Sequence, residues 1–345
     1  MSNHVVIVGA GAVGCLSALE LAERGWKVTL LDRGPIGGEA SWAGGGIMFP
    51  LLPWNYTEPV NRLAMAGIAR YPALCASLLD TTGIAPEYLV CGMQVLPDYG
   101  GEAAIQWCRS HGMAADVRED GLWLPQVSQV RNPRLLQALH ARLLALGVSV
   151  TEHIQLAPLQ DQEGKVTAWH SLDGQVFEAD AFVLTAGAWS RNLLGTHALG
   201  LQHKPMRGQM LLYKLHRQEL AHIIFHEDFY LIPRRDGHVL AGSTVEDVGF
   251  DKSTTAEAAA RLAAKAAARL PQLADVPLLR HWAGLRPGSP DNIPVIDRHP
   301  QFDNLYLNTG HFRYGVTMAP ASAEILARLV CGEAPDNAMG EYPFP

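Results

Sequence analysis

The fold is decided near the start of the chain, by residues 4–32: HVVIVGAGAVGCLSALELAERGWKVTLLD. A short β-branched run, His4–Val8, precedes a glycine-rich turn, Gly9–Gly14, and apolar residues at helical spacing follow the turn. A second apolar run, Lys27–Leu31, ends at Asp32. This order of strand, turn, helix and strand predicts the opening βαβ unit of a doubly wound sheet with parallel strands.

The glycine-rich turn fits the pattern G-x-G-x-x-G. Gly9 permits a tight turn, Gly11 lets the backbone approach a pyrophosphate, and Gly14 lets the helix pack close to the strand. The N-terminus of the helix would face the phosphates, and Asp32 would accept hydrogen bonds from a ribose diol. In this context the turn predicts a dinucleotide site rather than a turn without a ligand.

Three more segments decide between a nicotinamide and a flavin. Residues 41–48, SWAGGGIM, are poor in bulky side chains, so the backbone can run against a cofactor. Thr185–Gly187 ends a buried run, and Thr309–Thr317, TGHFRYGVT, leads from a strand into the last helix. Each segment alone could be an ordinary turn. Together they favour FAD, because a flavin needs extra backbone beyond the pyrophosphate to hold its ribityl chain and ring.

Two arginines and one tyrosine are candidates for binding a substrate carboxylate. Arg286 lies in the segment WAGLRPG, and Arg313 lies in the loop before the last helix. Both are surrounded by glycine and aromatic residues rather than by other charges, and the planar guanidinium can bind a carboxylate at two points. Tyr230 could add a hydroxyl group, although core packing is the alternative interpretation for a lone aromatic residue in a strand.

Composition excludes several classes of protein. The chain has 345 residues, 48% of them hydrophobic, and a formal net charge of -7 without a block of Lys and Arg, so no nucleic-acid partner is expected. The five cysteines are scattered and form no CxxC motif, and no HExxH motif occurs, so neither a disulfide framework nor a metal site is predicted. This use of cysteine favours a cytoplasmic location. No transmembrane segment is predicted, and the apolar run Val5–Ala22 is expected to be a buried strand and helix, not a signal sequence.

The fold class that follows is α/β, with a doubly wound, Rossmann-like FAD-binding domain interleaved with an antiparallel-sheet domain that binds the substrate. We expect residues 1–84, 131–204 and 285–345 to form the first domain, and residues 85–130 and 205–284 to form the second. Residues 85–130 are expected to hold only short strands and loops. The strands expected in the second domain are Gln209–Leu215, Ala221–Phe225, Phe229–Pro233 and His238–Ala241, and the main helices after the first are Leu63–Leu79, Asn132–Leu146, Ala256–Leu270 and Ala319–Val330.

Taken together, the segments GAGAVG, WAGGGIM, TAGAWS, WAGLRPG and GHFRYG, with the terminal Asp32, resemble the D-amino acid oxidase family of flavoproteins. The bacterial glycine oxidase branch, which serves the thiazole half of thiamine synthesis, is the most similar branch. The resemblance covers essentially the whole chain. It implies oxidative deamination of glycine, and also of sarcosine and small D-amino acids, by hydride transfer to flavin N5. Glyoxylate or the imine, ammonia and hydrogen peroxide would be the products.

The resemblance also implies roles for residues. Arg313 would form the main ion pair with the substrate carboxylate, assisted by Arg286 and Tyr230. FAD would be bound non-covalently, since the only late cysteine, Cys331, lies in or just beyond the last helix. The residues implied in FAD binding are Gly9, Gly11, Ala12, Val13, Gly14, Asp32, Arg33, Ala40, Ser41, Gly45, Gly46, Ile47, Leu156, Gly187, His311, Phe312, Arg313, Tyr314, Gly315, Val316 and Thr317.

Some expectations come with open alternatives. The implied partners are a small amino acid and dioxygen, and the resemblance implies a homo-oligomer, a tetramer. A smaller polar residue often stands where this chain has Tyr314, which would alter the substrate pocket. A sarcosine or N-methyl amino acid oxidase, and a D-amino acid dehydrogenase that uses another electron acceptor, are alternatives on the same fold. A non-catalytic FAD-binding subunit is a third.

Overall fold

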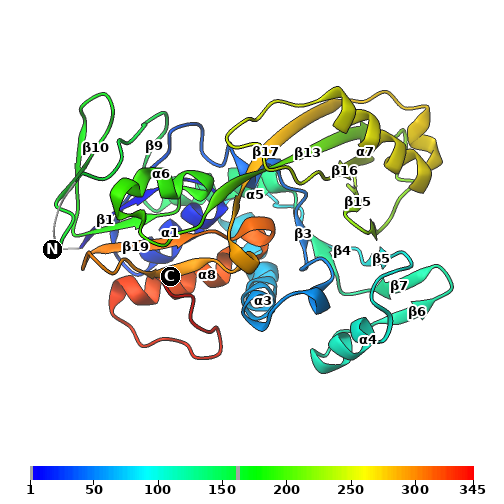
Figure 1. Ribbon diagram of the computed structural model, residues 1–345, viewed down its shortest axis with the longest axis horizontal. Helices are drawn as coiled ribbons and strands as arrows, with labels where there is room; N and C mark the ends of the chain where they lie inside the picture. The colour runs from blue at the N-terminus through cyan, green and yellow to red at the C-terminus, as the bar shows by residue number, and fades with distance from the viewer. Residues whose placement is uncertain (1–2, 161–163) are drawn as a thin grey trace.

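The computed structural model describes residues 3–160 and 164–345. Its first sheet has six strands in the order β18-β19-β12-β1-β2-β9 (Figure 1). Neighbouring strands are parallel except at one edge, where β18 runs antiparallel to β19. The strands are β1 His4–Val8, β2 Lys27–Leu31, β9 Ser149–Thr151, β12 Ala181–Leu184, β18 Val295–Arg298 and β19 Leu305–Thr309. This sheet confirms the predicted doubly wound arrangement.

Strand β1 lies inside this sheet and is buried on both faces. Val5 and Ile7 belong to one hydrophobic core, and Val6 and Val8 belong to the core on the opposite face. The uninterrupted β-branched run in the sequence therefore serves two cores at once. The first core is closed by helices α1 Ala12–Glu23, α3 Glu58–Thr82, α5 Asn132–Ala145 and α8 Gly315–Cys331. Over the second lie helix α6 Ser190–Leu194 and the hairpin of β10 Ala168–His170 and β11 Val176–Glu178.

The second sheet has eight strands in the order β17-β13-β16-β15-β14-β5-β7-β6. Its pairs are antiparallel except β14 with β5. Figure 1 shows it at the end of the molecule opposite the hairpin β10–β11, with helix α7 Ala256–Arg269 over one face. The strands are β5 Met93–Val95, β6 Asp116–Arg118, β7 Gly121–Leu124, β13 Lys204–Lys214, β14 Ile223–His226, β15 Phe229–Pro233, β16 His238–Gly242 and β17 Arg280–Gly288.

The mixture of parallel and antiparallel sheets confirms the predicted fold class, while the domain boundaries remain a prediction. Strand β17 crosses the predicted boundary at residue 285. A third sheet has three strands in the order β3-β8-β4. Along the chain, each of these strands lies between a strand of one large sheet and a strand of the other. It consists of β3 Ile47–Met48, β4 Leu89–Val90 and β8 Ser128–Gln129, and the short helix α2 Ala40–Ala43 precedes it. None of the helices in the described part of the chain is long and apolar enough to cross a membrane.

One expected segment and several expected starts of elements were wrong. Residues 85–130 are not only strands and loops, because helix α4 spans Gly101–Ser110. It begins after Gly100 without a capping side chain, so the sequence carries no start signal, and it is held by packing of Trp107 against Phe49 and Trp54. Three elements begin earlier than expected: β13 at Lys204 instead of Gln209, α3 at Glu58 instead of Leu63, and α8 at Gly315 instead of Ala319.

Candidate active site

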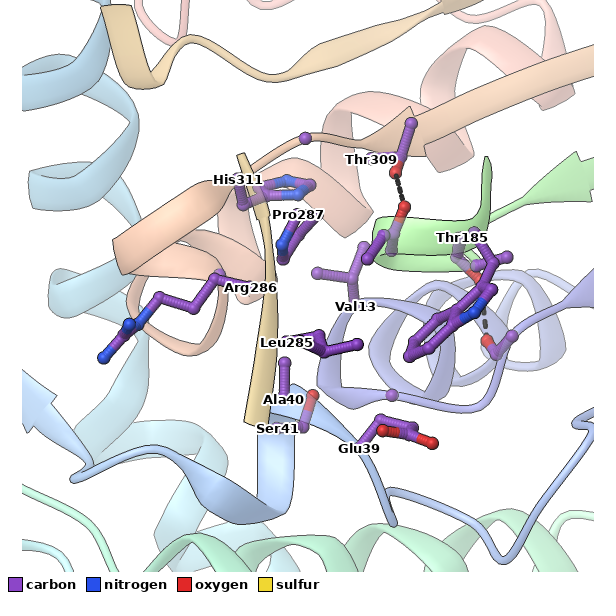
Figure 2. Close-up of a pocket in the computed structure, with 18 of the residues that line it drawn as sticks. Val13, Glu39, Ala40, Ser41, Thr185, Leu285, Arg286, Pro287, Thr309 and His311 are labelled. Atoms are coloured by element: carbon purple, nitrogen blue, oxygen red, sulfur yellow. Dashed lines mark hydrogen bonds between the residues drawn. The ribbon is translucent and has the colours of Figure 1, made fainter. Parts of the chain in front are cut away.

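A cavity of about 400 Å³ lies where the carboxyl ends of the parallel strands face the antiparallel sheet. Its walls include the residues that follow four of those strands: Gly9 after β1, Asp32 after β2, Thr185 after β12 and Gly310 after β19. Figure 2 shows strand β17 passing over this cavity, with Leu285 on the side of Val13 and Arg286 projecting to the other side.

The structure brings almost all of the predicted site residues to this one cavity. Ala12 and Gly14 are the exceptions, because they lie behind its wall. The predicted residues that line it are Gly9, Gly11, Val13, Asp32, Arg33, Ala40, Ser41, Gly45, Gly46, Ile47, Leu156, Gly187, Tyr230, Arg286, His311, Phe312, Arg313, Tyr314, Gly315, Val316 and Thr317.

The glycine-rich turn owes its shape to packing on one side and openness on the other. A Cβ atom on Gly14 would lie 1.8 Å from the Gly9 carbonyl oxygen, so only glycine allows helix α1 to start here. Gly9 has a φ of +109° and is in contact with the backbone of Thr185. The Ala12 N–H donates to Ser41 Oγ at 2.8 Å. Gly14 and Ala12 therefore form the turn without lining the cavity.

Asp32 is held in place by the backbone. Its Oδ2 accepts from the Ala10 N–H at 2.7 Å, and its Oδ1 accepts from the Gly34 N–H at 2.9 Å. Burial raises the pKa of Asp32, and these two hydrogen bonds act in the opposite direction. Each carboxylate oxygen keeps a further lone pair that can accept from a ribose hydroxyl.

Beyond Asp32 the cavity has an apolar end, where the Arg33 guanidinium also lines the wall. Its walls there include Ile154, Leu156, Pro158 and Leu172, which suit an adenine ring. The Arg33 guanidinium lies 3.5 Å from the centre of the Trp189 ring and also donates to Glu39 at 2.8 Å. Trp189 was missed as a site residue, although it lies in the quoted segment TAGAWS.

The glycine loop Gly44–Gly46 is held from behind by side chains and backbone. Asn132 Nδ2 donates to the Ser41 carbonyl at 2.7 Å, and the Val130 N–H donates to the Gly46 carbonyl at 2.9 Å. A Cβ on Gly45 would lie 2.5 Å from Ile232 Cδ1. Asn132 lines the cavity but was missed, since in the sequence it reads only as the first residue of a helix.

The opposite end of the cavity is cationic. Arg286 donates to the Thr244 carbonyl at 3.0 Å and to Ser243 Oγ at 2.8 Å. Arg313 is exposed and rests against the ring of Phe312. Burial lowers the pKa of Arg286, and the nearby charge of Arg313 lowers it further. Over residues 3–160 and 164–345 neither arginine forms an ion pair with a carboxylate, so both can bind an anion.

Tyr230 and a pair of histidines complete this end. The Tyr230 hydroxyl donates to Met210 Sδ at 3.4 Å, Tyr230 lines the same cavity as Arg286, and the tyrosine raises the pKa of that arginine. His311 is 2% exposed and lines the cavity, and its Nε2 has no partner within the part of the chain that the structure describes. Burial and the neighbouring His203 lower the pKa of His311 to about 3, so its ring is neutral.

The residues present fit FAD from one end of the cavity to the other. An apolar end is followed by Asp32, the start of α1 after Gly11, the loop Gly44–Gly46 without side chains, and the start of α8. At Gly187, with a φ of +54°, a Cβ would have no atom of the described residues within 4 Å, so the backbone there is open toward the cavity. A turn without a ligand would not need this sequence of features.

Comparison with known proteins agrees with this geometry. A family profile described as FAD dependent oxidoreductase matches residues 4–329, and the chain belongs to this family. Within the family it is similar to glycine oxidases over nearly its whole length. It is 43% identical to a glycine oxidase of Pseudomonas aeruginosa, and the alignment covers 97% of this chain and 96% of that one.

Two further relatives extend the comparison. The crystal structure of glycine oxidase from Bacillus cereus superposes with a TM-score of 0.89 at 27% identity, covering 98% of this chain and 97% of that one. The bifunctional protein ThiO/ThiG of Trichormus variabilis is 31% identical over 100% of this chain and 55% of its own length. These similarities confirm the predicted fold class, enzyme class and family resemblance.

Proposed function

We propose that this protein is an FAD-dependent glycine oxidase that also accepts sarcosine and small D-amino acids. The observation that carries the proposal is the pair Arg286 and Arg313, which have no acidic partner among the described residues and share one cavity with the dinucleotide turn. An amino acid substrate brings the missing carboxylate. Similarity to glycine oxidases, at 43% and 42% identity, supports the same substrate class.

The chain's own residues bind and orient the substrate. Arg286 is fixed by Ser243 and Thr244, so it sets the direction of the carboxylate. Among the described residues Arg313 makes no hydrogen bond or ion pair through its guanidinium, so it can form the second arm of the clamp, and Tyr230 adds a hydroxyl. The family resemblance gives the main ion pair to Arg313. The rise in KM for glycine on replacement of each arginine will show which of the two binds the carboxylate more strongly.

The walls beside the clamp are apolar and limit the size of the substrate. Phe49, Ile47 and Leu51 line the cavity and pack with the hydrophobic cluster that contains Tyr230. The acidic residues that line the described cavity are Asp32 and Glu39, both close to Arg33. Among the residues that the structure describes, no carboxylate lining the cavity is therefore placed beside the clamp as a general base, and the proposed reaction uses the neutral amine.

The residues that line the cavity would hold FAD, and bound FAD would supply the two-electron redox chemistry that couples oxidation of the amino acid to reduction of dioxygen to hydrogen peroxide. Non-covalent binding is supported by the lining residues, which include no cysteine in the described part of the chain. The similarity to ThiO/ThiG supports use of the product in thiamine thiazole synthesis. We also propose that the protein is a cytoplasmic homo-oligomer and that its two domains have the bounds expected from the sequence.

An anaerobic absorbance spectrum of the purified, FAD-loaded protein tests the proposal. Glycine should bleach the flavin band, and air should restore it with formation of hydrogen peroxide. If only sarcosine or D-alanine bleaches the band, the clamp stands but the substrate is wrong. Bleaching that air does not reverse would indicate a dehydrogenase. A flavin that none of these substrates reduces would leave a non-catalytic FAD-binding protein.

A further inference from the structure

Arg234, which directly follows strand β15, is a buried cation that the catalytic proposal does not use. It is 5% exposed. Its guanidinium donates to the Gly45 carbonyl at 2.8 Å, to the Val130 carbonyl at 2.9 Å and to the side-chain oxygen of Gln129. In the region that the structure describes, Arg234 forms no ion pair with a carboxylate.

A buried charge without a counter-ion is costly, so it is retained only where several acceptors replace water. The three carbonyl oxygens around Arg234 supply these acceptors. Burial lowers the pKa of Arg234 to about 10; the charge of Arg131 acts in the same direction, and the charges of Glu87 and Asp236 act in the opposite direction. The guanidinium is therefore still protonated at neutral pH, and its charge is fixed behind the glycine loop Gly44–Gly46.

Strand geometry explains how Arg234 reaches this loop. Side chains alternate along a strand, so Tyr230 and Ile232 project from the same face of β15, and Arg234, directly after the strand, continues this alternation. Tyr230 lines the cavity, and Ile232 touches the position where a Cβ on Gly45 would lie. The loop thus crosses this face, with the substrate-binding tyrosine at one end and the buried cation at the other.

The hydrogen bond to Gly45 orients the next peptide N–H. In a trans peptide the carbonyl of one residue and the N–H of the following residue point in opposite directions. Because the Gly45 carbonyl points at Arg234, the Gly46 N–H points away from Arg234. Gly46 lines the cavity, and within the described residues its N–H has no acceptor. On its other side Gly46 is packed, because a Cβ would lie 2.2 Å from the Val130 carbonyl oxygen.

We propose that Arg234 is a positioning residue that aims the Gly46 N–H at the flavin ring and holds a positive charge behind it. The ring accepts hydrogen bonds at its carbonyl oxygens and ring nitrogens and becomes more negative on reduction. A donor and a cation on this side therefore stabilise the reduced form more than the oxidised form. The inference rests on the proposed position of the flavin ring beside Gly45–Ile47, and it does not depend on glycine being the substrate.

The test compares three variants of the full chain. Arg234→Met removes the charge and the donors, and Arg234→Lys keeps the charge without the planar fork. Arg235→Met is the matched control, because Arg235 is the exposed neighbour and carries the same charge. The readouts are the dissociation constant of FAD from the apoprotein, by flavin fluorescence, and the reduction potential of the bound flavin, by equilibration with reference dyes.

We expect Arg234→Met to weaken binding of reduced FAD at least tenfold more than binding of oxidised FAD, which lowers a two-electron potential by about 30 mV. Arg234→Lys should recover part of this shift, and Arg235→Met should leave the potential unchanged. A lower melting temperature with a wild-type potential in Arg234→Met would show a purely structural role and overturn the proposal.

Other outcomes are equally decisive. If Arg234→Met does not fold, a wild-type potential and FAD affinity in Arg234→Lys overturn the proposal. An equal shift in Arg235→Met would do the same, since it would show a general effect of net charge. If the wild-type apoprotein binds no FAD, the proposed function fails and this inference fails with it. Normal FAD binding with an unchanged potential removes this inference alone.

Discussion

The Tyr314 hydroxyl lies against the backbone of Leu51, where it accepts from the N–H at 3.1 Å and donates to the carbonyl at 3.4 Å. Tyr314 is 3% exposed, and its ring packs edge-on against Tyr56 at a centroid distance of 5.2 Å. Leu51 lines the cavity, and Tyr314 follows Arg313 directly. Tyr314 therefore joins the loop that carries Arg313 to another segment of the cavity wall.

Replacement of Tyr314 should change substrate selectivity. Tyr314→Asn removes the contact with Leu51, which is worth about 1 kcal/mol per hydrogen bond, and frees the pocket wall. One such contact contributes ~1 kcal/mol, which corresponds to roughly a fivefold change in a ratio of rate constants. We therefore expect the kcat/KM for sarcosine, divided by that for glycine, to rise roughly fivefold. Steady-state oxygen uptake with both substrates measures this ratio. Tyr306→Phe, on β19 and outside the cavity, is the control, and an unchanged ratio in Tyr314→Asn contradicts the role.

Loss of either arginine of the clamp should raise KM. Arg286→Met and Arg313→Met each remove charge-assisted hydrogen bonds worth about 1.5–3 kcal/mol, so KM for glycine should rise about 10- to 100-fold. The larger rise identifies the arginine that forms the main ion pair. Arg280→Met is a matched control on the same strand, since Arg280 rests on Trp42 and does not line the cavity. A wild-type KM would remove that arginine from the clamp.

Asp32 should contribute to FAD affinity and not to turnover. Asp32→Asn removes the charge and one acceptor toward the ribose, and a loss of about 1.4 kcal/mol corresponds to a tenfold higher dissociation constant. With saturating FAD, kcat should stay at the wild-type value. Asp180→Asn is the control, since Asp180 also accepts a backbone N–H, from His4 at 2.8 Å, far from the cavity. Equal affinities in the two variants would contradict the ribose role.

The buried histidines should make the folded protein sensitive to mild acid. Burial lowers the pKa of His203 to about 4 from the ordinary 6.5, and that of His311 to about 3. Below pH 6.5 the unfolded chain binds protons that the folded protein does not bind, so the free energy of unfolding falls. The slope is up to ~1.4 kcal/mol per pH unit for each histidine, down to about pH 4. Above pH 6.5 neither state binds these protons, and the contribution is flat.

Thermal unfolding at pH 5 to 8 with saturating FAD measures this dependence. His203→Gln removes one of the two groups and should reduce the loss of melting temperature between pH 7 and pH 5. His216→Gln, at an exposed position, serves as the control and should keep the wild-type profile. If His203→Gln also keeps that profile, the buried histidine is not the source of the acid sensitivity.

The parts of the fold that the sequence predicted well are those with local signals. Strands β1, β2 and β15 have the predicted bounds, because each is a short apolar run that ends at a turn. Strand β17 was not predicted as a strand, since Gly284, Pro287 and Gly288 read as a loop. The structure shows that Pro287 pairs with Pro205, in the part of β13 where β16 does not pair, so the missing N–H groups cost little.

By itself, the sequence determined the strand-turn-helix start, the dinucleotide pattern that ends at Asp32 and the glycine-rich loops. These features depend on backbone sterics within a few residues. The tertiary structure alone decided which distant groups meet at the cavity. Arg234 and Gly45 are 189 positions apart, and Tyr314 and Leu51 are 263 apart. Such contacts depend on the pairing of whole sheets and the burial of their faces, which no local pattern encodes.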